Sequence, residues 1–217
     1  MSVAASTTAA ERPLAIVVDD DGSVRDALGE LLNSVGIESI AFSSARELLD
    51  AKLPDRPSCL VLDVRMPGLS GIDLQHRFKD IGISIPIVFL TGHGDIAMSV
   101  EAMKAGAVDF LTKPVRDQSI LDAVSTAIAS DIARRAAETI SRRNRALYDT
   151  LTPRERQVLR SVVTGAMNKQ IAFKLDITEV TVKLHRSSMM KKMHASSITH
   201  LLSAWQSLPA EIRTGES

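Results

Sequence analysis

The chain of 217 residues is 45% hydrophobic and carries no formal net charge at neutral pH. That length exceeds the usual size of one domain, so we expect two unequal domains that need no disulfide or metal to fold. The first residues lack the basic and apolar segments of an export signal, and no stretch approaches the roughly 18 apolar residues of a membrane span. The single cysteine, Cys59, lies in an apolar run, which favours a buried thiol in a reducing compartment. We therefore expect a cytoplasmic protein without a membrane partner.

The two halves of the chain differ in charge. Residues 1–130 contain 11 Lys and Arg against 18 Asp and Glu, a net charge of −7. Residues 131–217 contain 15 against 8, a net charge of +7. A basic second half favours a nucleic-acid partner, because Lys and Arg neutralise phosphates. Two ordinary solvated surfaces would also fit these charges, so the motifs must decide.

Short apolar strands alternate with amphipathic helical segments from residue 14 to about residue 129. The expected strands cover residues 14–18, 37–42, 59–63, 85–90 and 108–111. Apolar side chains at helical spacing mark a first helix at Val24, Leu28, Leu31 and Leu32, and a fourth at Ile96, Val100 and Met103. This alternation predicts an α/β doubly wound, five-stranded parallel sheet of the flavodoxin-like type, with helices on both faces.

A long helix and a second, all-α domain are expected after the sheet. Apolar residues recur every fourth position from Ile120 to Ile132, so the fifth helix should run past the domain edge. The following segment contains no Gly or Pro, which favours a helical linker. The sequence Thr152-Pro153-Arg154-Glu155 is a capping box that starts a new helix. Four helices are expected, over residues 153–163, 168–175, 179–193 and 197–207. The resulting division is an N-terminal tail (1–13), a first domain (14–130), a helical linker (131–150) and a second domain (151–217).

Acidic residues follow two of the predicted strands. Asp19 and Asp20 end the first strand and Asp63 ends the third. Ligands of open α/β sheets bind at the carboxyl ends of strands, so these carboxylates should converge, and they suit Mg²⁺. Thr91 ends the fourth strand and Lys113 follows the fifth, which adds a hydroxyl and an ammonium group. Each residue alone has a plain alternative as a helix cap or a solvated lysine. Together they are what a covalently bound phosphoryl group requires.

Four segments resemble the receiver domains of two-component response regulators, over residues 14 to about 130. The segments are Val18-Asp19-Asp20, Leu62-Asp63-Val64-Arg65-Met66-Pro67-Gly68, Phe89-Leu90-Thr91-Gly92 and Asp109-Phe110-Leu111-Thr112-Lys113-Pro114. Val115 departs from the pattern, since Phe is more usual there, and this affects packing rather than chemistry.

The resemblance implies roles for the residues of these segments. By this resemblance Asp63 is the phosphoacceptor, and a sensor histidine kinase supplies the phosphoryl group. Mg²⁺ is held by Asp19, Asp20, Asp63 and the backbone carbonyl of Arg65. Thr91 and Lys113 bind the phosphoryl oxygens, Phe110 is the switch aromatic, and the Lys113-Pro114 bond is cis.

The helix expected at residues 179–193 has two different faces. Ile177 before Thr178 forms a hydrophobic staple with Val182, behind an N-cap. At about 100° per residue, one stripe is apolar and buried, and it consists of Val182, Met189 and Met193. The opposite stripe consists of Val180, Lys183, Leu184, Ser187 and Lys191. This outward face suits a major groove, although a solvated cationic helix has the same pattern.

The segments at residues 151–156, 168–172 and 181–186 resemble the LuxR-type helix-turn-helix, and the whole chain resembles the NarL/FixJ class of response regulators. The resemblance implies base contacts by Lys183, Leu184 and Ser187, and phosphate contacts by Lys169, Thr181 and Arg186. It also implies that duplex DNA and RNA polymerase are partners and that phosphorylation favours a homodimer. Asp176 stands where Gly is usual, and Asp tolerates the left-handed conformation. A last apolar stripe at helical spacing consists of Ile198, Leu201, Leu202 and Trp205. It is expected either to pack in the core or to form dimer contacts.

Two other functional classes fit less well. A phosphohydrolase of the haloacid-dehalogenase type also uses an Asp nucleophile, but it needs a second acid two residues later, where this chain has Arg65. We therefore expect no enzyme beyond weak self-phosphorylation and autodephosphorylation. A receiver whose second domain binds RNA or protein is the remaining alternative.

Overall fold

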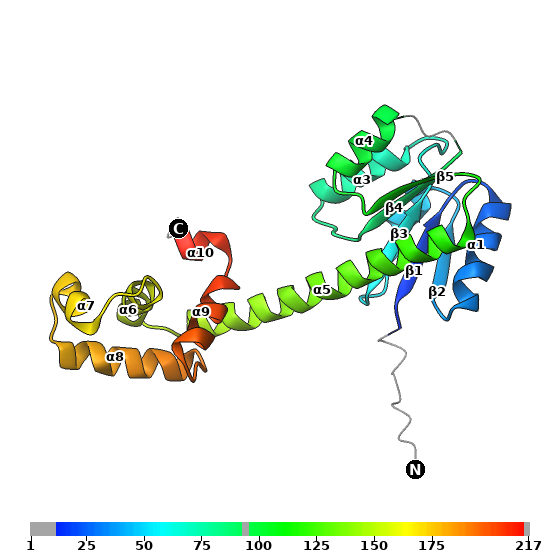
Figure 1. Ribbon diagram of the computed structural model, residues 1–217. Coiled ribbons are helices and arrows are strands. Elements are labelled where there is room, and N and C mark those ends of the chain that lie inside the picture. Colours follow the sequence, from blue (N-terminus) through cyan, green and yellow to red (C-terminus); the bar gives the residue numbers. More distant parts are fainter. Residues whose placement is uncertain (1–11, 93–95, 215–217) are drawn as a thin grey trace, which may run out of the picture. The chain divides into compact units, whose positions relative to one another are not determined.

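The computed structural model describes residues 12–92 and 96–214, and the chain forms two compact units, Met1–Arg134 and Arg135–Ser217 (Figure 1). The elements of the first unit are β1 (Leu14–Val18), α1 (Gly22–Ser34), β2 (Glu38–Phe42), α2 (Ala45–Asp50), β3 (Ser58–Leu62), α3 (Gly71–Asp80), β4 (Ile87–Thr91), α4 (Ile96–Lys104) and β5 (Asp109–Thr112). Helix α5 (Asp117–Asp149) begins in the first unit and ends in the second. The second unit continues with α6 (Pro153–Val163), α7 (Asn168–Leu175), α8 (Glu179–Lys192), α9 (Ile198–Gln206) and α10 (Ala210–Thr214).

The five strands form one parallel sheet in the order β2-β1-β3-β4-β5. Strands β1, β3 and β4 are buried along their whole length, which explains why each is a continuous apolar run. The predicted fold class is confirmed; β1 has the predicted bounds, and the ends of the other four strands differ from the predicted ones by at most two residues. Strand β4 begins at Ile87, after Pro86, whose carbonyl accepts a hydrogen bond from the Leu60 N–H.

Alternate residues of the central strands separate into two cores. One core lies under α2, α3 and α4, and the other lies under α1 and α5, on the opposite face of the sheet (Figure 1). Cys59 belongs to the second core and is fully buried, as expected for a structural thiol. Burial, with a smaller effect from the nearby Asp131 charge, raises the pKa of the Cys59 thiol to about 12.

Helix α4 forms where the apolar spacing predicted a fourth helix. The apolar stripe that marks this helix in the sequence is exposed: Ile96, Val100 and Met103 have exposed fractions of 84%, 44% and 46%. The helix packs through Ala102, which is fully buried, and through half-buried Met98. Helix α4 has apolar residues on two faces, and local spacing does not tell which face meets the sheet.

The second unit has its own apolar core, built around Leu159, Ile171, Val182, Met189 and Leu201. In its described part it contains five short helices after α5, not the four expected. The additional helix, α10, spans five residues and buries Ile212 near Leu208 in the core. A single buried side chain gives too short a pattern for helical periodicity to show. Among the described residues, no helix has both the length and the apolar composition that crossing a membrane requires.

Candidate metal centre and nucleic-acid interface

Three carboxylates meet at the carboxyl edge of the sheet. Asp19 and Asp20 follow β1, Asp63 follows β3, and the Asp63 N–H donates to the Val18 carbonyl across the two neighbouring strands at 2.8 Å. One carboxylate oxygen of each aspartate lies within 4.8 Å of the others. Asp19 and Asp63 are buried, whereas Asp20 is exposed. The structure therefore brings together the three acids that the sequence placed at strand ends.

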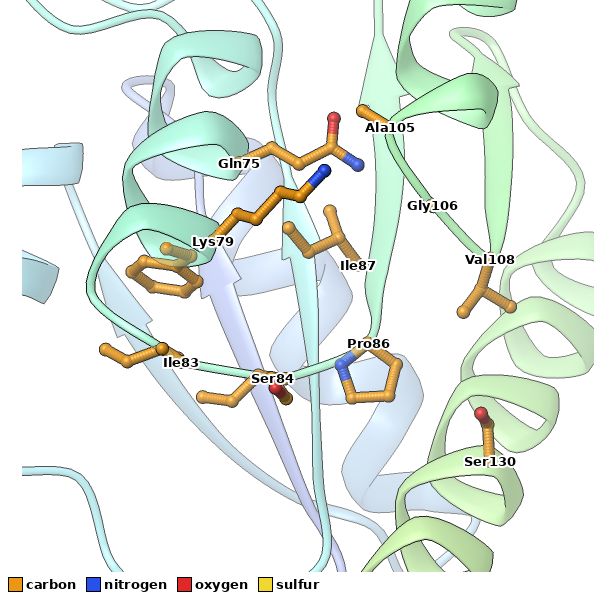
Figure 2. A pocket seen from close by; sticks show the side chains of 13 residues that line it. Gln75, Lys79, Ile83, Ser84, Pro86, Ile87, Ala105, Gly106, Val108 and Ser130 are labelled. Carbon is orange, nitrogen blue, oxygen red and sulfur yellow. The ribbon is translucent and has the colours of Figure 1, made fainter. Parts of the chain in front are cut away.

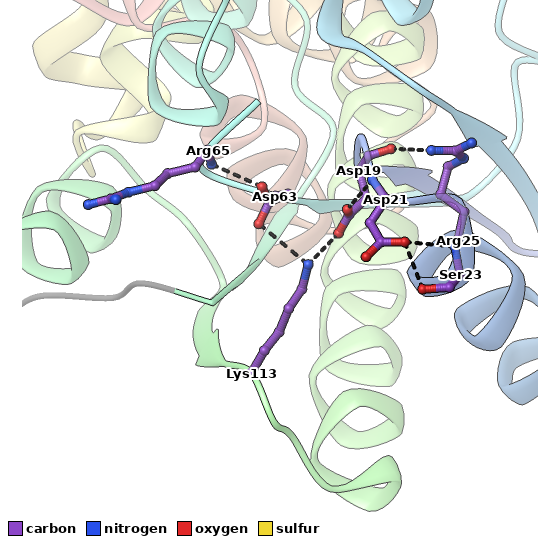
Figure 3. Close-up of polar contacts among 7 residues, drawn as sticks. All are labelled: Asp19, Asp21, Ser23, Arg25, Asp63, Arg65 and Lys113. Carbon is purple, nitrogen blue, oxygen red and sulfur yellow. Dashed lines mark hydrogen bonds and ion pairs between the residues drawn. The ribbon is translucent and has the colours of Figure 1, made fainter. Parts of the chain in front are cut away.

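Lys113 reaches into this cluster from the end of β5. Its Nζ lies 2.6 Å from Oδ2 of Asp19 and 3.6 Å from Oδ1 of Asp63 (Figure 3). Its backbone N–H donates to the Thr91 carbonyl at 2.8 Å, which joins it to the end of β4. The Lys113-Pro114 bond is cis, as expected, and Thr91 is fully buried beside it. Lys113 is thus already paired with two carboxylates of the cluster.

The charge of the cluster is not compensated by Lys113 alone. Burial raises the pKa of Asp63, and the charges of Asp19 and Asp20 raise it further. Lys113 and the Arg65 N–H, which donates to Asp63 at 3.0 Å, oppose this shift without reversing it. A hard cation among these oxygens would favour ionised carboxylates, and the exposed Asp20 leaves the cluster open to water. The residues present therefore fit a divalent cation that keeps some of its waters.

Neighbouring residues that the sequence did not single out hold the cluster in place. Arg25 donates through Nη1 to the Asp19 carbonyl at 2.7 Å. Asp21 caps α1 by accepting from the Ser23 N–H at 2.8 Å (Figure 3). Gly71 starts α3, and a Cβ atom there would lie 2.3 Å from the Asp63 carbonyl oxygen. A glycine is required at residue 71 because α3 begins in direct contact with the Asp63 backbone.

Phe110 lies on β5, half-buried beside the fully buried Phe89. Their ring centroids are 6.0 Å apart and the rings are tilted by 43°. This aromatic pair links β5 to β4, two strands whose ends carry Lys113 and Thr91. Phe110 therefore lies on the edge strand against the aromatic residue of β4, and packing encloses it only in part.

Helices α7 and α8 of the second unit form a helix-turn-helix. Asp176 ends α7 in the left-handed conformation, with φ of 52°, so the turn forms with Asp in place of the usual Gly. Thr178 caps α8 by accepting from the Thr181 N–H at 3.2 Å, as expected. Ile177 packs against the core that contains Val182, consistent with the predicted staple. The start of α8 is therefore firmly defined.

The exposed and buried faces of α8 are those expected. Val182, Met189 and Met193 are buried, whereas Lys183 and Ser187 are exposed. Two aliphatic side chains on the outer face, Val180 and Leu184, are each 66% exposed. Water is an unfavourable environment for such side chains, so this face has the composition of a contact surface.

The three residues expected at phosphates differ in their surroundings. Lys169 is exposed near the start of α7. Thr181 and Arg186 are half-buried: the Thr181 hydroxyl is 2.8 Å from the Thr178 hydroxyl, and Arg186 donates to the Asn168 side chain at 3.0 Å. The Arg186 hydrogen bond ties α8 to the first residue of α7, which gives Arg186 a structural contact in addition to any contact with a ligand.

A buried network centred on Glu155 was missed at the sequence level. The capping box showed only its first role, in which the carboxylate accepts from the Thr152 N–H at 2.8 Å. The same carboxylate accepts from the Ser188 hydroxyl at 2.6 Å and from Lys192 at 2.7 Å. Glu155 therefore fastens α6 to the carboxyl half of α8. These partners lie more than 30 residues away in the chain, and no local spacing indicates them.

Both units match known protein families. Residues 15–125 match the response regulator receiver domain, and residues 149–204 match the bacterial regulatory proteins of the luxR family. Nodulation protein W of Bradyrhizobium diazoefficiens is 52% identical over 196 residues, which cover 90% of this chain and 86% of that protein. The transcriptional regulatory protein FixJ of Rhizobium meliloti is 45% identical over 187 residues, which cover 86% and 91%.

Two solved structures extend these likenesses over both units. The response regulator StyR has 47% sequence identity and a TM-score of 0.77, with coverage of 90% of this chain and 98% of that one. Full-length FixJ from B. japonicum has 38% identity and a TM-score of 0.55, with coverage of 91% and 97%. The chain therefore belongs to the response regulators, and it joins a receiver domain to a DNA-binding domain of the luxR family.

Proposed function

We propose that this protein is a two-component transcriptional regulator in which phosphorylation of Asp63 controls DNA binding. The observation that carries the proposal is the buried Asp63 carboxylate, set among Asp19, Asp20 and Lys113 in a chain that also contains a luxR-type domain. The relative FixJ is named a transcriptional regulatory protein, which supports this function. A DNA target implies action in the cytoplasm. In this proposal the chain has four parts: an N-terminal tail (1–13), the receiver (14–130), a linker (131–150) and the DNA-binding domain (151–217).

Asp63 acts as the nucleophile toward a sensor histidine kinase. An Asp63 carboxylate oxygen forms a bond to phosphorus while the phosphorus–nitrogen bond of the kinase phosphohistidine breaks, and the histidine keeps the electron pair. Lys113, 3.6 Å from Asp63, pairs with a phosphoryl oxygen. Asp19, Asp20, Asp63 and the Arg65 carbonyl would hold Mg²⁺, which when bound would neutralise phosphoryl charge. Beyond this transfer, the residues support only slow self-phosphorylation and autodephosphorylation.

The phosphoryl group changes the packing at the ends of β4 and β5. The Thr91 hydroxyl turns to a phosphoryl oxygen. Phe110 then moves into the space beside β4 that the Thr91 side chain has left. The exposed Val100 and Met103 of α4 then take part in a homodimer interface, which removes them from water. Light scattering with and without beryllium fluoride tests this step. The proposed dimerisation is contradicted if the protein has the same molar mass with and without beryllium fluoride at every concentration over a range that spans monomer and dimer.

The dimer presents two α8 helices to duplex DNA. Lys183, Leu184 and Ser187 contact base edges in the major groove, and Lys169, Thr181 and Arg186 contact phosphates. Bound in this way near a promoter, the protein contacts RNA polymerase. The exposed outer face of α8 supports this proposal, since it combines a cation with aliphatic side chains.

Substitution of Asp63 tests the proposed function. Intact-mass measurement should show one added phosphoryl group on the wild-type chain after incubation with acetyl phosphate and Mg²⁺, and none on Asp63→Asn. Asp26→Asn is the matched control, because Asp26 is exposed on α1. Fluorescence anisotropy with genomic fragments selected by the phosphorylated protein should then show tighter binding for wild type and Asp26→Asn only. Undiminished phosphorylation of Asp63→Asn contradicts the assignment, and preferential binding of RNA contradicts the proposed target.

A further inference from the structure

The outer face of α8 carries two aliphatic side chains that lie largely in water. Val180 and Leu184 are each 66% exposed, and neither packs with the apolar core of the second unit. They are four positions apart, so both lie on the same face of the helix, with their Cβ atoms about 5–6 Å apart. Neither side chain has a polar atom, and contact with another apolar group would remove it from water. The pair is therefore suited to a partner that presents apolar groups.

Polar and cationic side chains surround this pair. Lys183 and Ser187 are exposed and each lies three positions after one member of the pair, and the exposed Lys191 follows on the same face. A two-fold contact with a second copy of the chain would bring the lysines of both copies together, which is unfavourable. The net charge of residues 131–217 is +7, which favours a negatively charged partner. The face therefore fits a surface with anionic edges and small apolar groups between them.

The major groove of duplex DNA has this combination of groups. Phosphates border the groove on both sides, and base edges form its floor. Thymine is the one base of the four whose edge in this groove carries a methyl group. Cytosine has a hydrogen atom at the same position and would leave an aliphatic side chain partly in water.

We propose that Val180 and Leu184 recognise the 5-methyl groups of two thymines in each half-site, beside the base pair that Lys183 contacts. The inference rests on the proposed binding of α8 in the major groove, and it adds the kind of base that the aliphatic side chains select. The distance of about 5–6 Å between their Cβ atoms exceeds the 3.4 Å step between bases on a strand, so the two side chains meet different base pairs.

A cavity of about 380 Å³ at the amino edge of the receiver sheet lacks such a combination of groups (Figure 2). Among the described residues that line it, only Lys79 is charged, and Lys79 is exposed. An exposed lysine beside apolar side chains is solvated by water and requires no ligand. The cavity therefore identifies no class of ligand, whereas the outer face of α8 does.

Removal of single methyl groups from the DNA tests the inference. The probe is a duplex selected from a random-sequence pool by the full-length protein with beryllium fluoride and Mg²⁺, and each thymine is replaced in turn by deoxyuridine. Deoxyuridine keeps the base pair and its hydrogen-bonding groups and lacks only the methyl group. In each half-site two replacements should raise the Kd about 3- to 5-fold, the effect of one buried methyl group. Fluorescence anisotropy measures the Kd of each duplex.

Variants of α8 show whether these two side chains recognise the methyl groups. Leu184→Ala should abolish the effect of deoxyuridine at one of the two positions, and Val180→Ala should abolish it at the other. Phe173→Ala is the matched control and should keep both effects, because Phe173 is an apolar residue of α7, 92% exposed and outside the α8 face. All three side chains are largely exposed, so circular dichroism should show an unchanged fold.

Two results would overturn the inference and leave the proposed function intact, provided that the unmodified selected duplex binds tightly. One is that fewer than two replacements in each half-site raise the Kd. The other is that both effects persist in Val180→Ala and Leu184→Ala, which means that the methyl groups act through the shape of the DNA. If the activated protein does not prefer duplex DNA to RNA, the proposed function and this inference fail together.

Discussion

Replacement of Glu155 tests how the proposed recognition helix is held in place. The Glu155 side chain is 4% exposed, and its carboxylate accepts from Lys192, from Ser188 and from the Thr152 N–H at 2.6–2.8 Å. Two of these donors lie on α8 and one lies at the start of α6. The single carboxylate therefore stabilises both a helix terminus and the contact between α6 and α8.

The size of the effect follows from what each substitution leaves behind. Glu155→Ala leaves three donors without their acceptor, and a broken buried ion pair costs about 3–5 kcal/mol where the remaining charge stays buried. The Lys192 side chain is 35% exposed and can turn to water, which reduces the cost. We expect Glu155→Ala to lower the free energy of unfolding by about 2–4 kcal/mol. Glu155→Gln keeps an acceptor and the side-chain volume, and should cost about 1–2 kcal/mol.

The pH dependence gives an independent check. Burial disfavours the charged form of Glu155, but hydrogen bonds from Lys192, Ser188 and Thr152 outweigh it and lower the pKa from 4.5 to about 2. A group with a lowered pKa in the folded state stabilises that state fully above its unfolded pKa, and the contribution is lost as pH falls toward the folded pKa. The stability difference between wild type and Glu155→Gln should therefore be constant above about pH 5 and shrink as pH falls toward 2.

The assay is urea unfolding of the full chain followed by fluorescence of Trp205. This residue is the single tryptophan of the protein and packs against the core of the second unit, so it reports that unit alone. Glu211→Gln is the control, because Glu211 is exposed in the same unit. A loss below about 0.5 kcal/mol for Glu155→Ala, which is the range of ordinary surface substitutions, refutes the reasoning. A difference between wild type and Glu155→Gln that does not change with pH refutes the electrostatic part.

Four further outcomes follow from the structure. Lys183→Ala should weaken specific DNA binding by about 1–3 kcal/mol and relax preference at one base pair, whereas Lys169→Ala should weaken all sequences alike and lower the salt slope by about one, both measured by anisotropy. Cys59 should react with iodoacetamide at pH 8 only as the protein unfolds, since its thiol is fully buried and its pKa is about 12; mass spectrometry of native and urea-treated protein measures this. Asp63→Asn should stabilise the first unit by about 1 kcal/mol without divalent cations, because one of three crowded carboxylates is removed; urea unfolding followed by circular dichroism checks it. Asp176→Val should destabilise the second unit by about 1–2 kcal/mol in the Trp205 assay, because a β-branched residue disfavours a φ of 52°.

The parts of the fold that depend on local sequence were predictable. Strands buried on both faces appear as unbroken apolar runs, and such runs end where the chain leaves the sheet. Asp19 and Asp63 follow two of these runs directly, so parallel strands alone bring them to the same edge. The turn between α7 and α8 was predictable for a similar reason, since Ile177 and Thr178 define the helix start within a few residues.

Contacts between distant segments were not predictable from spacing. Helix α4 has apolar residues on two faces, and only the assembled sheet decides that Ala102 packs inward while Val100 does not. The contact of Gln75 with Ala102 spans 27 positions, and those of Glu155 with Ser188 and Lys192 span 33 and 37 positions. Such partners are selected by tertiary packing, to which a local pattern gives no access.

Several groups in the described part of the chain are left in unfavourable surroundings, and they lie where a partner is proposed to bind. Asp63 is a buried carboxylate whose pKa is raised by burial and by its acidic neighbours, and a cation or phosphoryl transfer would relieve that cost. Leu184 keeps 66% of its surface in water on the outer face of α8, where DNA would cover it. The interior of the same units shows the opposite tendency, since the Glu155 carboxylate has three donors and the central strands are buried and apolar. Folding alone would favour substitutions that relieve these groups, so variants such as Asp63→Asn should gain stability at the expense of the binding that each group serves.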